Sequence, residues 1–238
     1  MSWQSLLISS LVLIPIAFAQ DSYLAHNCLT SADGEFTPDS NYSQSLTYLV
    51  DDLCFNAPLN KGFRNASWAQ DPADRAYGLA LCRGDVSPKD CETCLTNATI
   101  TVANTSCPNS RGAFILHDYC QLKYSDVDFL GKMNSITAYI MSQGDAGDDN
   151  FREAALGLIR NLSQTAIGAP DKLFASGTTA IGNTTTLYSM VQCTRDISAD
   201  HCRGCLGTAV NELTIANTSA RFVSASCNLR YDIRPFLN

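Results

Sequence analysis

The chain has 238 residues, of which 45% are hydrophobic and 16% are charged, and it contains 11 cysteines. This length and apolar content suit one large or two modest folded domains and argue against a wholly disordered chain. The formal net charge of −7 argues against a general nucleic-acid binder and against a cationic membrane-disrupting peptide, because both need an excess of lysine and arginine.

Residues 1–19 have the features of a secretory signal peptide. They carry no charge, are mostly apolar from Leu6 onward and end in an Ala-Phe-Ala triplet, the small-x-small pattern that signal peptidase reads. A membrane anchor is the alternative, but the apolar run is short for a span and the cleavage pattern follows it at once. The C-terminus is neither an apolar anchor tail nor a retention signal. We expect a soluble secreted protein without a membrane span, whose mature chain starts at Gln20.

Two helices are expected in the first half of the mature chain. Apolar residues fall at i, i+3, i+4 and i+7 of an amphipathic helix at Leu46, Leu49, Val50 and Leu53. A second helix should begin at Ser87, because serine is a good N-cap and Pro88 suits the first turn. Cys91 and Cys94, at i and i+3 of that helix, would share one face and can point into the core.

Strand-like runs follow this helix. Residues 113–116 lead to Cys120 and continue into 122–124, with β-branched and aromatic side chains in alternation. Residues 221–225 and 229–231 repeat the pattern around Cys227. Since helices and strands segregate along the chain with few long crossovers, the pattern favours an α+β fold with antiparallel sheets.

The cysteines show an internal duplication. The spacing C-x8-C-x2-C occurs twice, 111 residues apart, at Cys82, Cys91 and Cys94 and again at Cys193, Cys202 and Cys205. Tyr77 and Tyr188 stand five residues before the two motifs, and a Cys-x-Leu-Lys/Arg-Tyr segment closes each copy at 120–124 and 227–231. A period of this length predicts two tandem domains rather than a solenoid.

We expect the signal peptide over 1–19, the first domain over 20–130, a linker over 131–150 and the second domain over 151–238. The Gly- and Asp-rich stretch 142–150 marks the boundary, and a helical stripe follows it from Phe151 to Leu162. The aspartates of this stretch, Asp145, Asp148 and Asp149, lack EF-hand spacing, so a solvated linker is favoured over a calcium loop.

Two further features point to the secretory route. All 11 cysteines follow the predicted signal, as an oxidising compartment permits. The chain also carries seven N-x-S/T sequons against roughly three expected by chance, at Asn41, Asn65, Asn97, Asn104, Asn161, Asn183 and Asn217. They predict a glycosylated surface, although some may be polar turns; Asn97 is the most doubtful because it falls inside the second predicted helix.

These motifs resemble the plant ginkbilobin-homologous domain, also called the stress-antifungal or cysteine-rich repeat domain. The resemblance covers two copies over residues 23–238 and is greatest to cysteine-rich repeat secretory proteins. The same tandem forms the ectodomain of cysteine-rich receptor-like kinases and plasmodesmata-located proteins. The resemblance implies that each domain consists of two helices packed on a five-stranded antiparallel sheet.

The resemblance also implies five disulfides: Cys28–Cys107, Cys82–Cys91, Cys94–Cys120, Cys193–Cys202 and Cys205–Cys227. Cys54 is left over, and a buried free thiol is favoured there over an intermolecular bridge. Taken alone, the Cys-x-x-Cys pair at 91–94 also suits a redox or zinc site. The chain offers only His26, His117 and His201 as further imidazole ligands, so we expect structural disulfides and neither a metal nor a cofactor.

The first hypothesis for function is carbohydrate binding in defence. The family's antifungal member binds mannose through an Asn, an Arg and an acidic residue. In the first domain Leu29, Phe114 and Ser125 occupy these positions and none of them matches. In the second domain Arg221 and Asp232 match the last two, while the Asn position cannot be placed. Together they can donate to and accept from sugar hydroxyls, or they can form a surface ion pair of little energetic worth.

Trp68 could stack on a sugar, although a core or loop anchor is favoured for it. The second hypothesis is an extracellular module that associates with receptor-like kinase ectodomains or cell-wall glycans in stress signalling. The third, an enzyme, is disfavoured, because none of the common hydrolase, zinc or phosphate-binding motifs occurs. The sequence therefore predicts a secreted, non-catalytic defence or stress protein of the apoplast, with a glycan or a receptor ectodomain as partner.

Overall fold

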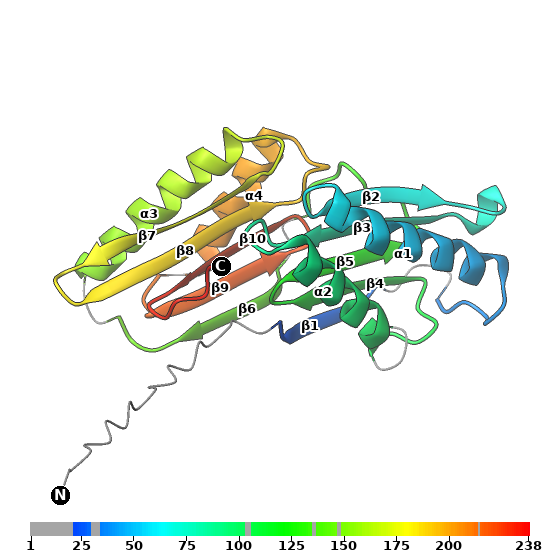
Figure 1. Cartoon of the computed structure of the whole chain (residues 1–238), viewed down its shortest axis with the longest axis horizontal. Coiled ribbons are helices and arrows are strands. Elements are labelled where there is room, and N and C mark those ends of the chain that lie inside the picture. The colour runs from blue at the N-terminus through cyan, green and yellow to red at the C-terminus, as the bar shows by residue number, and fades with distance from the viewer. Residues whose placement is uncertain (1–20, 30–33, 103–105, 135–136, 147–148, 214) are drawn as a thin grey trace, which may run out of the picture.

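The computed structural model describes residues 21–29, 34–102, 106–134, 137–146, 149–213 and 215–238. The predicted signal peptide and its cleavage point lie outside these residues. Within them the chain forms two tandem domains, each with one five-stranded antiparallel sheet and two helices (Figure 1). The predicted α+β architecture is confirmed.

The first sheet has the strand order β1-β4-β5-β3-β2, and every neighbouring pair is antiparallel. A short 3₁₀ helix, Pro72–Asp74, precedes β3. The first domain consists of β1 (Tyr23–Cys28), α1 (Asn41–Leu59), β2 (Phe63–Trp68), β3 (Ala76–Cys82), α2 (Pro88–Thr101), β4 (Gly112–His117) and β5 (Cys120–Ser125).

The second sheet repeats this order as β6-β9-β10-β8-β7, again with antiparallel pairs throughout. The second domain consists of β6 (Thr137–Gln143), α3 (Asp149–Ile167), β7 (Phe174–Ile181), β8 (Thr185–Cys193), α4 (Ala199–Glu212), β9 (Ser219–Ser224) and β10 (Cys227–Asp232). The duplication seen in the cysteine spacing is thus a duplication of the whole fold.

The predicted linker, 131–150, is shorter in the structure. Strand β6 lies inside it and pairs with β9 of the second sheet, and α3 begins at Asp149. The boundary between the domains therefore precedes β6 instead of falling in 142–150. The Gly- and Asp-rich residues belong to the connection from β6 to α3, because a strand that enters a helix within a few residues needs a tight turn.

The helix starts follow from their capping residues. The Ser87 hydroxyl accepts a hydrogen bond from the backbone N–H of Asp90, and the Ser198 hydroxyl accepts one from His201. Each serine satisfies one of the free N–H groups in the first turn, as predicted for both copies. Cys91 and Cys94 are buried on the inner face of α2, which also matches the predicted i, i+3 placement.

Each domain has its own core between its helices and one face of its sheet. In the first, α1 lies so close to β3 that a Cβ on Gly78 would stand 2.6 Å from Cδ1 of Leu53, which is fully buried. Only a glycine leaves room for that approach. Within the described part of the chain, no helix is both long enough and apolar enough to cross a membrane.

Candidate functional site at the domain junction

All five disulfides that the resemblance implies are present. The structure pairs Cys28–Cys107, Cys82–Cys91, Cys94–Cys120, Cys193–Cys202 and Cys205–Cys227. In both copies the conserved spacing joins the end of a central strand to the start of a helix and that helix to the last strand. These bridges fix each helix against its sheet, and each is worth on the order of 2–4 kcal/mol.

Cys54 is the unpaired cysteine of the described residues and lies half-buried between α1 and α2. Its Sγ is 3.4 Å from Oγ1 of Thr99. Burial raises the pKa of the Cys54 thiol, and the Thr99 hydroxyl only partly opposes this. A raised pKa disfavours the reactive thiolate, so Cys54 behaves as a packing residue.

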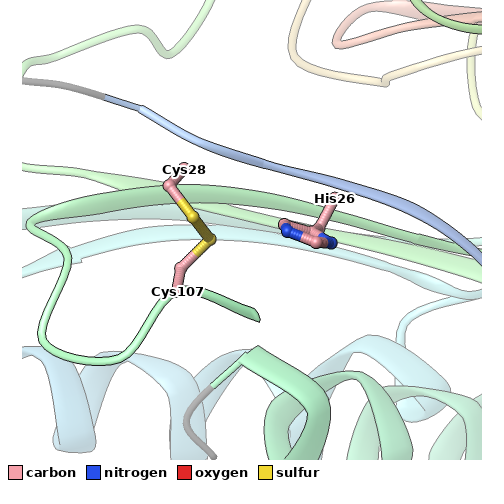
Figure 2. Close-up of side chains that lie close together, drawn as sticks. All are labelled: His26, Cys28 and Cys107. Atoms are coloured by element: carbon pink, nitrogen blue, oxygen red, sulfur yellow. A yellow bond between two sulfur atoms is a disulfide. The ribbon is translucent and has the colours of Figure 1, made fainter. Parts of the chain in front are cut away.

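Two groups of residues have the composition of a metal site, but disulfides use their sulfur atoms. His26 lies beside Cys28 and Cys107, whose sulfurs are bonded to each other (Figure 2). Asp21 and His117 lie beside Cys94, which is bonded to Cys120. A cysteine needs a free thiolate to bind a metal, so neither group offers a sulfur ligand.

The predicted glycosylation sites lie at the surface wherever the structure describes them. Asn41, Asn97, Asn161 and Asn183 are exposed, and Asn65 and Asn217 are half-buried. Asn104 lies outside the described residues. Asn97 is indeed within helix α2, as expected, but on its exposed side. The placement is compatible with glycan attachment at all six described positions.

Arg221 is not at the surface. It lies on β9, on the sheet face opposite the helices, and its side chain is only 3% exposed. Its Nη1 donates to Oδ1 of Asp118 at 2.5 Å. Because Asp118 sits in the turn between β4 and β5 of the first domain, this ion pair joins the two domains.

Two further arginines converge on the same carboxylate. Arg230, the neighbour of Arg221 across the β9–β10 pair, donates to Oδ1 of Asp118 at 3.0 Å. Arg83, which follows β3, places Nη1 3.6 Å from Oδ2 of Asp118 and binds Asp85 at 2.6 Å through Nε. We call Asp118 and these three arginines, Arg83, Arg221 and Arg230, the junction cluster.

The charges of the junction cluster are mutually dependent. Burial by itself would raise the pKa of the Asp118 carboxyl, but the guanidinium groups of Arg221, Arg230 and Arg83 outweigh it and hold the pKa below its ordinary value. Burial lowers the pKa of Arg221 to about 10, although Asp118 opposes this. Both groups are therefore charged at neutral pH, and a buried charge is stable only while its partner is present.

Asp232 does not join Arg221. It lies opposite Ser219 in the β9–β10 register and binds Arg230 at 3.7 Å and Arg234 at 3.2 Å. Over the described residues, no ion pair links Arg221 to Asp232. The structure thus places the two predicted sugar-binding residues on one sheet face but commits them to different partners.

The corresponding positions of the first domain are also occupied. Phe114 and Leu116 pack against Val223 of the second domain, and Ser125 is buried. Leu29 is half-buried beside β4. By contrast Trp68 is 37% exposed, and its ring lies 5.3 Å from the ring of Tyr48, so it is neither a core residue nor enclosed in a site.

The domains meet through related surfaces. The guanidinium of Arg195 lies 4.8 Å from the Phe63 ring. At the positions 111 residues away, Gly84 packs against Phe174, whose Cγ would lie 2.3 Å from a Cβ added to Gly84. Such reciprocal contacts are typical of an isologous dimer, here built within one chain.

The C-terminal residues cover the junction from the other side, where Figure 1 places the end of the chain between the two domains. Nη2 of Arg83 donates to the carbonyl of Phe236 at 3.0 Å, and the backbone N–H of Asn238 donates to Asp85. Arg230 stacks on the Phe236 ring, 3.9 Å from its centre. The two domains and the tail therefore form one packed unit.

Comparison with known proteins agrees with this architecture. Residues 27–127 and 140–234 both match the salt stress response/antifungal family. The chain belongs to this family, with two copies of its domain. The second match starts inside the segment predicted as linker, in agreement with the position of β6.

Members of this family align with nearly the whole chain. An antimicrobial ginkbilobin-2-like protein of Castanea crenata is 37% identical, with 98% of this chain and 96% of that protein aligned. Cysteine-rich repeat secretory protein 38 of Arabidopsis thaliana is 35% identical, over 91% and 86%. The chain is thus related to secreted cysteine-rich proteins.

The fold is also that of receptor-like proteins in the family. The tandem DUF26 ectodomain of the Arabidopsis thaliana cysteine-rich receptor-like protein PDLP8 superposes with a TM-score of 0.76 at 21% identity, over 88% of this chain and 97% of that one. A putative cysteine-rich receptor-like protein kinase 20 of the same plant is 34% identical over 91% of this chain but only 32% of its own length. The rest of that kinase has no counterpart here.

Proposed function

We propose that this family member is a glycosylated, non-catalytic recognition protein of the plant apoplast, which acts in defence or stress by binding a receptor-like kinase ectodomain. The observation that carries the proposal is the junction cluster. It commits Arg221 to Asp118 and docks the two domains as one unit, the architecture that tandem receptor ectodomains of the family also have.

The carboxylates support a role in binding rather than catalysis. A glycosidase needs two carboxyl groups about 5–10 Å apart that face an open cleft. Here the least exposed aspartates are bound to arginines: Asp85 to Arg83, Asp126 to Arg111 and Asp232 to Arg234. A carboxylate held by a guanidinium is a poor general acid, because the ion pair favours its charged form.

A second candidate is an antimicrobial role, favoured by the 37% identity to the Castanea crenata protein over almost its whole length. In its lectin form this candidate requires a mannose-type ligand at Arg221 and Asp232. A sugar could reach Arg221 only if the domains separated, since the guanidinium is buried against Asp118. We therefore propose that an antimicrobial action of this protein does not use mannose binding at Arg221.

The test is a binding experiment on the purified, disulfide-bonded protein with two immobilised probes, yeast mannan and a panel of cysteine-rich receptor-like kinase ectodomains. We expect binding to at least one ectodomain and none to mannan. A matched variant is Arg234→Ala, which removes an exposed arginine beside Asp232. Mannan binding that Arg221→Ala abolishes and Arg234→Ala preserves would contradict the proposal and establish the lectin function instead.

A further inference from the structure

A cavity of about 240 Å³ lies where the two domains meet, beside the junction cluster. Ligand pockets typically measure about 300–1,000 Å³, so this one suits a single small molecule rather than a polymer chain. Both domains contribute to its walls. Its apolar wall comes from the first domain and consists of Pro58, Leu81, Val86 and Pro88.

The polar wall of the cavity is positively charged. Its charged lining residues are all cationic: Lys61, Arg83, Lys172 and Arg195. Asp85 and Asp118 neutralise Arg83. For Lys61, Lys172 and Arg195, the described part of the chain provides no carboxylate within 4.0 Å. In a protein of net charge −7, three uncompensated cations around one cavity favour an anion there.

Arg195 is held in place for such a role. Its Nη1 donates to the carbonyl of Asp171 at 2.7 Å and its Nη2 to the carbonyl of Asn60 at 2.6 Å, so it bridges the domains. The Phe63 ring supports the guanidinium from one face. Backbone carbonyls fix the position of the group but do not cancel its charge, so its field still acts in the cavity.

The two lysines reach the cavity as a consequence of the duplication. Lys61 and Lys172 are 111 residues apart, the spacing that also relates Cys82 to Cys193, and each precedes the second strand of its sheet. The same backbone bond anchors both loops: Cys82 N–H donates to Gly62, and Cys193 N–H donates to Leu173. The reciprocal docking of the domains brings these equivalent loops to one cavity.

From this arrangement we infer that the cavity binds a small carboxylate-bearing sugar, a uronic acid. The lysines and Arg195 would hold the carboxylate by charge-assisted hydrogen bonds. The apolar wall would pack against the C–H face of the sugar ring. This inference goes beyond the proposed function, because binding at the cavity requires no partner protein and no mannose-type contact with Arg221.

The test is calorimetric titration of the full disulfide-bonded protein with galacturonic acid, with galactose and inorganic phosphate as the comparison ligands. We expect galacturonate to bind and galactose and phosphate to bind at least about 10-fold more weakly, since one charge-assisted hydrogen bond is worth about that factor. Binding should weaken as salt rises, because both lysines are exposed.

The variant Lys61→Gln/Lys172→Gln should lose at least about 10-fold in galacturonate affinity. Lys89→Gln is the matched control, since Lys89 precedes the cavity residue Cys91 on α2 but does not line the cavity. Both variants change only exposed side chains, so an unchanged melting temperature checks that the fold is intact. Equal binding of galactose, tighter binding of phosphate, no galacturonate binding, or an unchanged affinity of the double variant would each overturn the inference.

Discussion

Replacement of Asp118 by asparagine should destabilise the docked protein strongly. The substitution keeps the shape but removes the negative charge that faces three arginines. Arg83 retains Asp85 and Arg230 retains Asp232. Arg221, however, retains only the neutral side-chain oxygen of Asn228, 3.4 Å from Nε.

The magnitude follows from the burial of Arg221. Loss of one partner of a buried ion pair costs about 3–5 kcal/mol, because the other charge stays buried without compensation. Since asparagine still offers one acceptor oxygen, we expect the lower end, a loss of about 3 kcal/mol in the free energy of unfolding. Double replacement with Arg221→Met should recover a large part of this loss, because no buried charge is then left without a partner.

Urea denaturation with the disulfides intact measures this effect, with far-UV circular dichroism for the whole protein and Trp68 fluorescence for the first domain. Asp200→Asn is the control, because Asp200 pairs with Arg203 on the exposed side of α4 and should change stability by less than about 0.5 kcal/mol. If Asp118→Asn lowered stability no more than this control, the reasoning from a buried, docked junction would be refuted.

The same pair gives the pH dependence its sign. The pKa of Asp118 lies below its ordinary value in the folded protein. Its contribution to stability is therefore fully present above the unfolded pKa of about 3.9 and is lost as the pH falls through the folded value. The stability difference between the native protein and Asp118→Asn should accordingly be largest at neutral pH and shrink in acid. A difference that grew in acid would contradict this assignment.

Three further predictions concern packing and covalent links, all measured by urea denaturation. Gly84→Ala should cost about 1–3 kcal/mol, because the new Cβ would overlap the Phe174 ring across the junction; an unchanged stability would mean that the domains are not docked. Joint replacement of Cys193 and Cys202 by serine should cost about 2–4 kcal/mol, and a neutral result would mean that the bridge is absent. Cys54→Ser should cost less than about 1.5 kcal/mol, because the half-buried site already offers the Thr99 hydroxyl; a loss above 3 kcal/mol would indicate a bonded sulfur.

The sequence predicts those features that depend on neighbouring residues. Ser87 and Ser198 identify the helix starts because capping is decided within one turn. The cysteine spacing identifies two copies, and the family resemblance supplies the pairing that all five disulfides follow. Strand β6 was assigned to the linker because its seven residues carry no cysteine and few of the strand signals that mark its neighbours.

The junction could not be predicted because it depends on contacts between distant residues. Asp118 and Arg221 are 103 residues apart and in different domains. Arg221 and Arg230 alternate with core residues on their strands, a pattern that ordinarily indicates a solvent-facing side chain. Only the docking of the second domain on the first buries that face, and the same docking brings Lys61 to Lys172.

Arginine modification with phenylglyoxal, read by peptide mass spectrometry over time, tests the central claim most directly. The claim is that Arg221 is enclosed between the domains. Its side chain is 3% exposed, whereas that of Arg234 on the same domain is 66% exposed. We predict rapid modification of Arg234 and protection of Arg221 in the native protein. Modification of Arg221 at the rate of Arg234 would show that the domains open freely and that this arginine is available to a ligand.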